Sequence, residues 1–119
     1  MSIQRGITRG VFRSVIRSIV SDAGAAGNSV GVTTDVNGTH TIYYVLTTSA
    51  TPPTGTQIKA GQDHLGAAAS YADSIAATSS GSKTDSVGTL GAGTYYPYFY
   101  AENGTAGSAV LAGTSDVVA

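Results

Sequence analysis

The sequence lacks cysteine, long apolar runs and, over most of its length, charge. None of its 119 residues is cysteine and only 11% are charged. Without cysteine there is no disulfide framework and no thiolate metal site, so packing and backbone pairing must supply the stability. The length suits one small domain with an appendage. No apolar run approaches the roughly 20 residues that a membrane-spanning helix needs, so we expect no membrane partner.

Residue types for catalysis, metal binding and cofactor binding are equally scarce. The two histidines, His40 and His64, stand apart, and the seven acidic residues are scattered singly. Hydrolytic catalysis needs a nucleophile, a base and an orienting group, and a metal needs three or four converging ligands. The glycine-rich stretch 88–93 lacks the lysine of a phosphate-binding loop. We therefore expect a non-enzymatic protein with no catalytic residue, no metal and no cofactor.

Positive charge is concentrated at the N-terminus. All four arginines lie within the first 17 residues, giving that leader a charge of +4. The body that follows holds two lysines against seven acidic residues, a net charge of −5. Such a division indicates a positive element that seeks a negative surface.

The leader repeats a four-residue unit five times over residues 3–22. On a helix, its apolar residues and its arginines would form two opposed ridges, which drift by roughly 40° per repeat because the period is 4 instead of 3.6. On a strand, all nine odd positions from 3 to 19 would share one face and alternate apolar with arginine. The pattern favours a helix, whereas Gly6, Gly10 and the β-branched residues disfavour one. We expect the leader to order on docking, with helix ahead of an extended arm.

We interpret residues 1–21 as an N-terminal docking arm. Its arginines would meet acidic partner groups while its apolar residues fill a groove. Nucleic-acid binding is disfavoured because a single aromatic residue, Phe12, lies among the arginines. A mitochondrial transit peptide, with a mature chain starting near Asp22, and a terminus without a role stay as alternatives. The expected contact residues are Ile3, Arg5, Ile7, Arg9, Val11, Phe12, Arg13, Val15, Arg17 and Ile19.

The first half of the body predicts strands around an insertion. Residues 22–28 are typical of a linker. Apolar and polar residues alternate along residues 29–34, and residues 40–48 are rich in β-branched and aromatic residues, so both segments predict strands. The Asn37-Gly38 pair between them predicts a hairpin. Residues 49–66 break this pattern as a surface insertion, in which Thr54 can cap a helical turn over 56–61. Residues 67–77 fit either a short helix or an edge strand.

The second half predicts further strands. Residues 83–87 and 94–102 are strand-like, with a turn at 88–93, and the run 94–102 supplies most of the core. Pro97 limits pairing on its side because proline donates no backbone hydrogen bond. Asn103-Gly104 predicts a turn, and residues 108–118 a last strand. The sequons at Asn37 and Asn103 are better explained by these turns than by glycosylation.

The second half also resembles a known family. Leu90, Thr94-Tyr95-Tyr96, Ala101 and Asn103-Gly104 resemble the end of a fibronectin type III domain. The resemblance implies a tyrosine corner formed by Leu90 with Tyr96, or with Tyr95 if the register differs by one residue. Residues 39–66 are similar to a variety of this domain found in bacteriophage and bacterial surface proteins.

The resemblance covers residues 29–119 and implies a fold and a function. The fold is an all-β, fibronectin type III or immunoglobulin-like β-sandwich of about seven strands, preceded by the basic-apolar arm. The first strand must come from the leader or the linker. In phage, such modules decorate heads, necks and tails. We therefore expect three segments, namely the arm (1–21), the linker (22–28) and the sandwich (29–119).

We hypothesise a structural protein of the virion, most plausibly a capsid decoration or head-fibre subunit. Its partners would be other virion proteins, with a neck or tail connector as the alternative to the capsid. We also expect a homo-oligomer; a trimer is one candidate, although the sequence holds no oligomer code. A carbohydrate-binding module for host recognition is a further alternative. It would need Tyr95 and Phe99 to face outward while Tyr96, Tyr98 and Tyr100 face inward.

Overall fold

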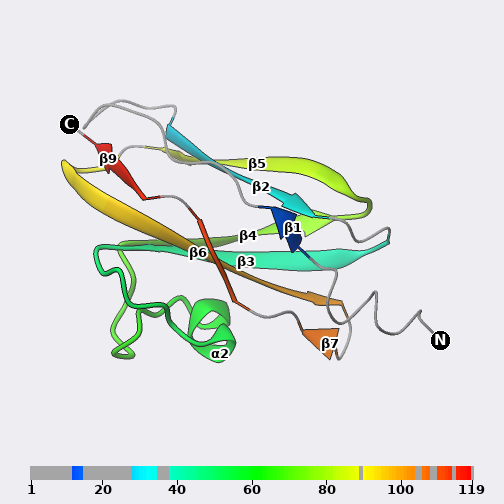
Figure 1. Cartoon of the computed structure of the whole chain (residues 1–119), viewed down its shortest axis with the longest axis horizontal. Helices are drawn as coiled ribbons and strands as arrows, with labels where there is room; N and C mark the ends of the chain where they lie inside the picture. Colours follow the sequence, from blue (N-terminus) through cyan, green and yellow to red (C-terminus); the bar gives the residue numbers. More distant parts are fainter. Residues whose placement is uncertain are drawn as a thin grey trace.

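Two antiparallel sheets form the domain, which confirms the expected all-β class (Figure 1). A computed structural model describes residues 12–14, 28–34, 38–88, 90–103, 106–107, 110–113 and 115–118. The smaller sheet has the strand order β1 (Phe12–Ser14), β2 (Asn28–Thr34) and β5 (Gly81–Gly88). The larger sheet has the order β4 (Tyr71–Ala77), β3 (His40–Thr47) and β6 (Gly93–Asn103). The other edge of β6 pairs with β7 (Ala106–Gly107), β8 (Leu111–Ala112) and β9 (Asp116–Val118).

The main core lies between the two sheets. Side chains alternate between the faces of a strand, so each strand contributes every second residue. The rings of Tyr44 and Phe99 pack in this core with their centroids 6.1 Å apart. The buried residues that fill it are Val30, Val32, Ile42, Tyr44, Leu46, Ala77, Val87, Leu90, Tyr95, Phe99 and Ala101.

Tyr95 ties the start of β6 to the preceding loop. Its hydroxyl donates a hydrogen bond of 2.8 Å to the carbonyl of Gly91, and Leu90 is buried beside it in the main core. Tyr96 packs on the opposite face of the sheet. Tyr95, and not Tyr96, therefore packs in the same core as Leu90 and makes the bond to Gly91.

The predicted hairpin between residues 29–34 and 40–48 is wrong. β2 pairs with β5, and β3 lies in the other sheet between β4 and β6. Both strands have an apolar face, and placing them in opposite sheets buries these faces together, which an isolated hairpin cannot do. His40 stabilises the crossing because its Nδ1–H donates to the Gly38 carbonyl at 2.7 Å and its Nε2 lies 3.1 Å from the Thr34 hydroxyl.

The arm supplies the first strand. Residues Phe12–Ser14 form β1, with the pairs Phe12↔Thr34 and Ser14↔Thr33. These three residues are extended in the structure, and their pairing with β2 supplies the backbone hydrogen bonds that a helix would have made internally. The helix predicted for the docked arm stays a prediction. The rest of the arm lies outside the described residues, and its conformation stays a prediction. β2 begins at Asn28, the last residue of the predicted linker, and Asn28 is buried.

The predicted last strand, 108–118, is divided, and its first part starts earlier. Between the pairs Glu102↔Gly107 and Phe99↔Leu111, the partner segment uses one residue more than β6 does. The same shift recurs between Tyr98↔Ala112 and Tyr95↔Asp116. The second shift lies opposite Pro97, which cannot donate to a ladder, and the Gly113 N–H donates instead to the Pro97 carbonyl at 2.8 Å.

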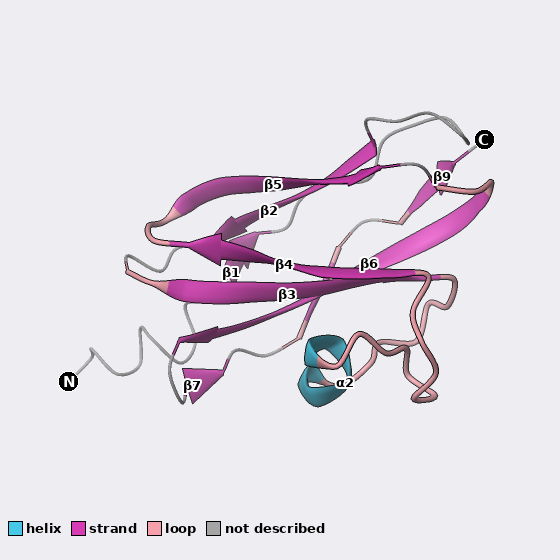
Figure 2. Cartoon of the chain, turned by 180° about the vertical axis from the view of Figure 1, so that it is seen from behind, coloured by secondary structure: helices cyan, strands magenta, loops and turns pink. Residues whose placement is uncertain are grey.

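The insertion between β3 and β4 folds as a third layer. Helix α2 (Gly55–Lys59) starts at Thr54 through a capping box, because the Gln57 N–H donates to the Thr54 hydroxyl and the Thr54 N–H to the Gln57 side chain. This confirms the predicted cap, although the helix is one residue earlier at its start. Ile58 is buried with Val45 and Tyr98 in a second core. Figures 1 and 2 show α2 against the face of the larger sheet that points away from the smaller sheet, which we call the outer face.

The segment 67–77, which the sequence left between helix and edge strand, contains the edge strand β4. Its register with β3 is unbroken from His40↔Ala77 to Leu46↔Tyr71. It stands at the end of the larger sheet, so one of its backbone edges has no neighbouring strand among the described residues.

Candidate partner-binding surface

The outer face of the larger sheet is covered and closely packed. Tyr100 lies between α2 and β7, and two glycines make room for its ring. A Cβ atom at Gly55 would lie 2.6 Å from the Cδ1 and Cε1 atoms of Tyr100, and one at Gly107 would overlap its hydroxyl. These contacts leave little of this face open to a partner.

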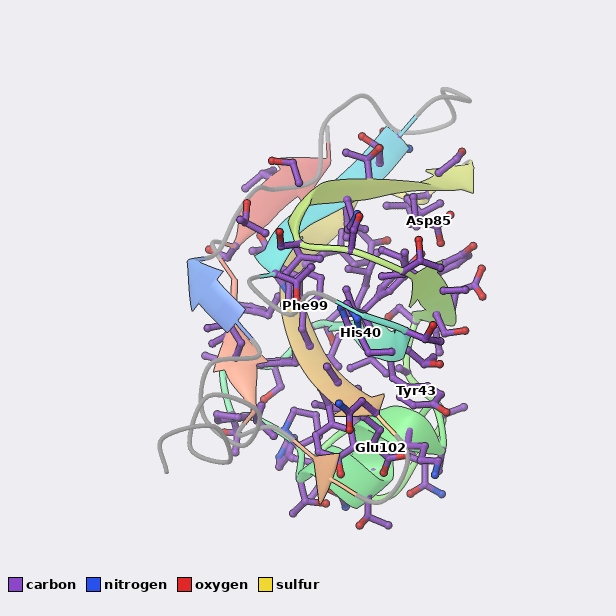
Figure 3. The ribbon with its side chains drawn as sticks, turned by 90° about the vertical axis from the view of Figure 1, so that its right-hand side faces the viewer. His40, Tyr43, Asp85, Phe99 and Glu102 are labelled. Atoms are coloured by element: carbon purple, nitrogen blue, oxygen red, sulfur yellow. The ribbon has the colours of Figure 1, made fainter. Side chains whose placement is uncertain are left out.

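An ion pair holds the insertion to the sheet. Lys59 Nζ lies 2.9 Å from Glu102 Oε1, and the Tyr100 hydroxyl donates to Glu102 Oε2 at 3.0 Å. Lys59 Nζ also lies 5.7 Å from the centre of the Tyr43 ring. The hydrogen bonds from Lys59 and Tyr100 lower the pKa of Glu102, and the same bond from Lys59 raises the pKa of that lysine. Figure 3 shows Tyr43 and Glu102 beside α2.

The side of the domain formed by β4 and β5, which we call the open edge, is different. Tyr44 is buried, and its hydroxyl reaches this edge to donate to Asp85 Oδ2 at 2.7 Å. The Tyr71 ring stacks on Tyr44 with the centroids 6.2 Å apart, and its hydroxyl lies 3.4 Å from Asp73 Oδ2. Figure 3 shows Asp85 on this side, away from α2. Two carboxylates therefore lie beside two stacked tyrosines.

The two carboxylates of the open edge have no ion pair in the part of the chain that the structure describes. Among the described residues, neither Asp73 nor Asp85 forms an ion pair, and Lys83, on the same face of β5, donates to Ser79 instead. Burial and the neighbouring carboxylates raise the pKa of Tyr44 and of Tyr71, so both tyrosines stay protonated donors. Asp73 is exposed and Asp85 half-buried, so a guanidinium can approach their free lone pairs.

β4 also offers its backbone. Natural proteins usually protect an edge strand with charged side chains, proline, a bulge or short length. β4 has seven residues, an unbroken register and no proline, and its one charged residue is Asp73, which an incoming cation would pair. Its outward-facing residues, Ala72, Ser74 and Ala76, are exposed and small. This strand can therefore accept a further strand.

The predicted surface-recognition residues lie elsewhere. Tyr95 and Phe99 are 7% and 1% exposed and face the main core, as Figure 3 shows for Phe99 between the sheets. Tyr96, Tyr98 and Tyr100 pack on the outer face. The predicted orientation of this strand is therefore wrong, because its odd residues face the other sheet. An aromatic platform of Tyr95 and Phe99 for carbohydrate is not available.

The predicted arm contacts are described only in part. Phe12 and Arg13 belong to β1. The other arm residues lie outside the described residues, namely Ile3, Arg5, Ile7, Arg9, Val11, Val15, Arg17 and Ile19. Their contacts stay a prediction.

The two histidines lie apart. His40 is buried at the start of β3, and His64 lies in the insertion. Within the described ranges, no three histidine, aspartate or glutamate side chains group as metal ligands. In that part of the chain no helix is long and apolar enough to cross a membrane.

The sequence did not point to the open edge. Asp73 and Asp85 are separated by twelve residues, and the segment holding Asp73 was undecided between helix and strand. A strand assignment for 71–77 would have placed Tyr71, Asp73 and Ile75 on one face, which is the signal that could have found this surface.

Comparisons with known proteins identify no relative. No family model matches the chain, and searches of curated proteins and of solved structures return no match. The functional argument therefore depends on the residues and their geometry.

Proposed function

We propose that the two sheets form a fibronectin type III-like sandwich. Three features support this assignment. The strand order places β1, β2 and β5 against β4, β3, β6 and a last strand made of β7, β8 and β9, which gives seven strand positions. The chain crosses between sheets from β2 to β3. The Tyr95 hydroxyl bonds back to Gly91, as the tyrosine corner of such sandwiches does.

On this fold we propose a non-enzymatic structural protein of the virion, most plausibly a capsid decoration or head-fibre subunit. The observation that carries the proposal is the segment 39–66, whose sequence resembles modules of phage structural proteins. This segment forms β3 and most of the insertion, which packs flat on the sheet through Ile58 and the Lys59–Glu102 pair. Such a segment serves packing, and its contacts contain no reactive group.

In this proposal the arm docks the sandwich onto protein. Arg5 and Arg9 precede β1, whose pairing with β2 anchors the arm to the domain at Phe12. The arm's +4 charge suits an acidic protein surface, and its Ile and Val residues suit an apolar one. The sandwich would project from the particle.

The test removes the arm and keeps the domain. Deleting residues 2–11 spares β1, so we expect the variant to fold. Particles are sedimented from a lysate of the encoding strain that expresses either the tagged variant or the tagged wild type. We expect the wild type to co-sediment with the particles and the variant to stay in the supernatant. The control, Thr56→Lys on the exposed side of α2, should co-sediment like the wild type. Wild-type protein that stays in the supernatant contradicts the virion proposal, and full incorporation of the deletion variant contradicts the arm's role. Immunogold labelling distinguishes a head from a neck or tail position.

A further inference from the structure

We propose that the N-terminal arm of one copy adds as a strand to β4 of a second copy, with its arginines facing Asp73 at the open edge. This inference specifies the partner in the docking role proposed for the arm, and so rests on that role. It makes the chain a homo-oligomer joined by β-strand addition.

The outer backbone edge of β4 can pair with another strand. β4 is a terminal strand with seven residues in regular register, and among the described residues nothing pairs with its outer edge. A row of unpaired N–H and C=O groups is a template for another strand. The small residues on its outward face, Ala72, Ser74 and Ala76, leave room for a neighbour.

The side-chain pattern of β4 favours a strand of a particular sequence. Its inward-facing residues at the open edge are Tyr71, Asp73 and Ile75, in the order aromatic, acidic, aliphatic. A strand added alongside would place its own inward face opposite these residues. The best match is a strand that reads apolar, basic, apolar at every second position.

The arm has this pattern. As an extended chain, its odd residues Ile7, Arg9 and Val11 share one face in the order apolar, basic, apolar. The order is the same in both directions, so parallel and antiparallel pairing both place Arg9 opposite Asp73. The even residues, Thr8 and Gly10, are small and would lie beside the small outward residues of β4. The alternation of apolar residues and arginines on one face of an extended arm therefore fits this edge.

The carboxylates of the open edge favour a partner strand that carries arginine. Asp73 and Asp85 accept hydrogen bonds from tyrosines, and Asp73 also from the Ser74 N–H, but neither forms an ion pair within the part of the chain that the structure describes. An arginine can bind a carboxylate through two N–H groups and stack on an aromatic face, and the Tyr71 ring lies beside Asp73. A lysine would lack the two-pronged, planar contact with the carboxylate, and a neutral strand would lack the charge as well.

The strand order favours a second copy over the chain's own arm. β1, which carries the arm, and β5, which borders the open edge, are at opposite ends of the smaller sheet. The donor and the acceptor thus lie on opposite sides of the domain. Such an arrangement gives a head-to-tail interface, which closes into a ring or continues as a chain of subunits.

The test separates donor from acceptor in the full chain. Deleting residues 2–11 leaves an acceptor without an arm, and Asp73→Lys leaves a donor with a like charge on its edge. By sedimentation velocity we expect the wild type to form oligomers. Each variant alone should associate at least about tenfold more weakly than the wild type. An equimolar mixture should form a 1:1 dimer through its one intact arm and one intact edge. Thr56→Lys, with the same added cation on α2, should associate as the wild type does.

Circular dichroism and thermal unfolding establish that both variants fold. A wild-type chain that stays monomeric, a mixture that forms no dimer, or an oligomer that survives in both variants overturns the proposal. Particle co-sedimentation of Asp73→Lys separates this inference from the proposed function. If that variant is incorporated normally and still self-associates like the wild type, the edge is not the acceptor and the virion role stands. If the wild type itself is absent from particles, the virion role fails whatever its oligomeric state.

Discussion

The outer face of the larger sheet and its open edge differ in how far the chain itself covers them and pairs their carboxylates. On the outer face, Glu102 is paired with Lys59 and the insertion covers the tyrosines. At the open edge, Asp85 accepts from the Tyr44 hydroxyl, and Asp73 accepts from the Tyr71 hydroxyl and the Ser74 N–H. Neither carboxylate has an ion pair, and β4 has no neighbouring strand on its outer edge, among the described residues. The domain covers one surface with its own chain, and we propose that the other binds a partner.

We expect this difference to separate the residues that stabilise the domain from those that bind a partner. Changes under the insertion should lower the free energy of unfolding, because buried contacts are lost there. Changes at the open edge should affect stability less and association more. Four predictions test this division, in order of decreasing effect.

The largest effect is expected from Ile58→Ala. Ile58 is 2% exposed beneath α2, and removing such a side chain costs about 2–5 kcal/mol. Ile75→Ala is the matched change at the open edge, where the side chain is only half-buried, and it should cost less. Urea unfolding of both variants measures the difference, and equal losses contradict the division.

Gly55→Ala should have the next largest effect. The new Cβ would lie 2.6 Å from the Tyr100 ring, so the helix or the ring must move, at a cost of about 1–3 kcal/mol. Trypsin should then cleave faster after Lys59, which lies at the end of α2. Gly55→Ala with wild-type stability and wild-type cleavage would show that the insertion is not clamped by this ring.

Tyr44→Phe should have a smaller effect, of about 1 kcal/mol, because it removes the 2.7 Å hydrogen bond to Asp85 but keeps the buried ring. Tyr71→Phe, whose hydroxyl lies 3.4 Å from Asp73, should change the unfolding free energy less. Thermal unfolding compares the two. A larger loss in Tyr71→Phe contradicts the assignment of the stronger bond.

Lys59→Met should have the smallest effect, because the Lys59–Glu102 pair is exposed to solvent. Lys59 lowers the pKa of Glu102 below its ordinary value of 4.5. The stabilisation is therefore present above that value and is lost as the pH falls through the lowered pKa. The difference in melting temperature between wild type and variant should shrink below pH 4.5. A difference that grows in acid contradicts the pair's contribution.

The sequence predicted the all-β class, most strand positions and the Thr54 cap because these depend on local pattern. Alternation along 40–48 and 94–102 identifies two strands, and the capping box needs only Thr54 and Gln57. Which face of β6 is buried could not be predicted. Tyrosines occupy both faces, and the outer face is buried as well, by an insertion whose packing the local sequence does not encode.

The open edge escaped prediction for a different reason. Asp73 and Asp85 lie beside the same pair of stacked tyrosines only because β4 and β5 close the same side of the sandwich, and that depends on the pairing of both sheets. The false hairpin at 29–48 has the same origin, because a turn signal such as Asn37-Gly38 does not say whether the next strand stays in the sheet. The arm's strand alternation was visible but had no partner until β4 was placed.

Hydrogen exchange of the β4 backbone tests the central claim most directly. It compares the amides of residues 71–77 in the full chain and in the chain lacking residues 2–11, at a concentration where the full chain is oligomeric. We predict that the β4 amides facing the open edge are protected only when the arm is present, while those of β3 exchange equally in both proteins. Equal protection of β4 in both proteins would contradict the claim that the arm occupies this edge.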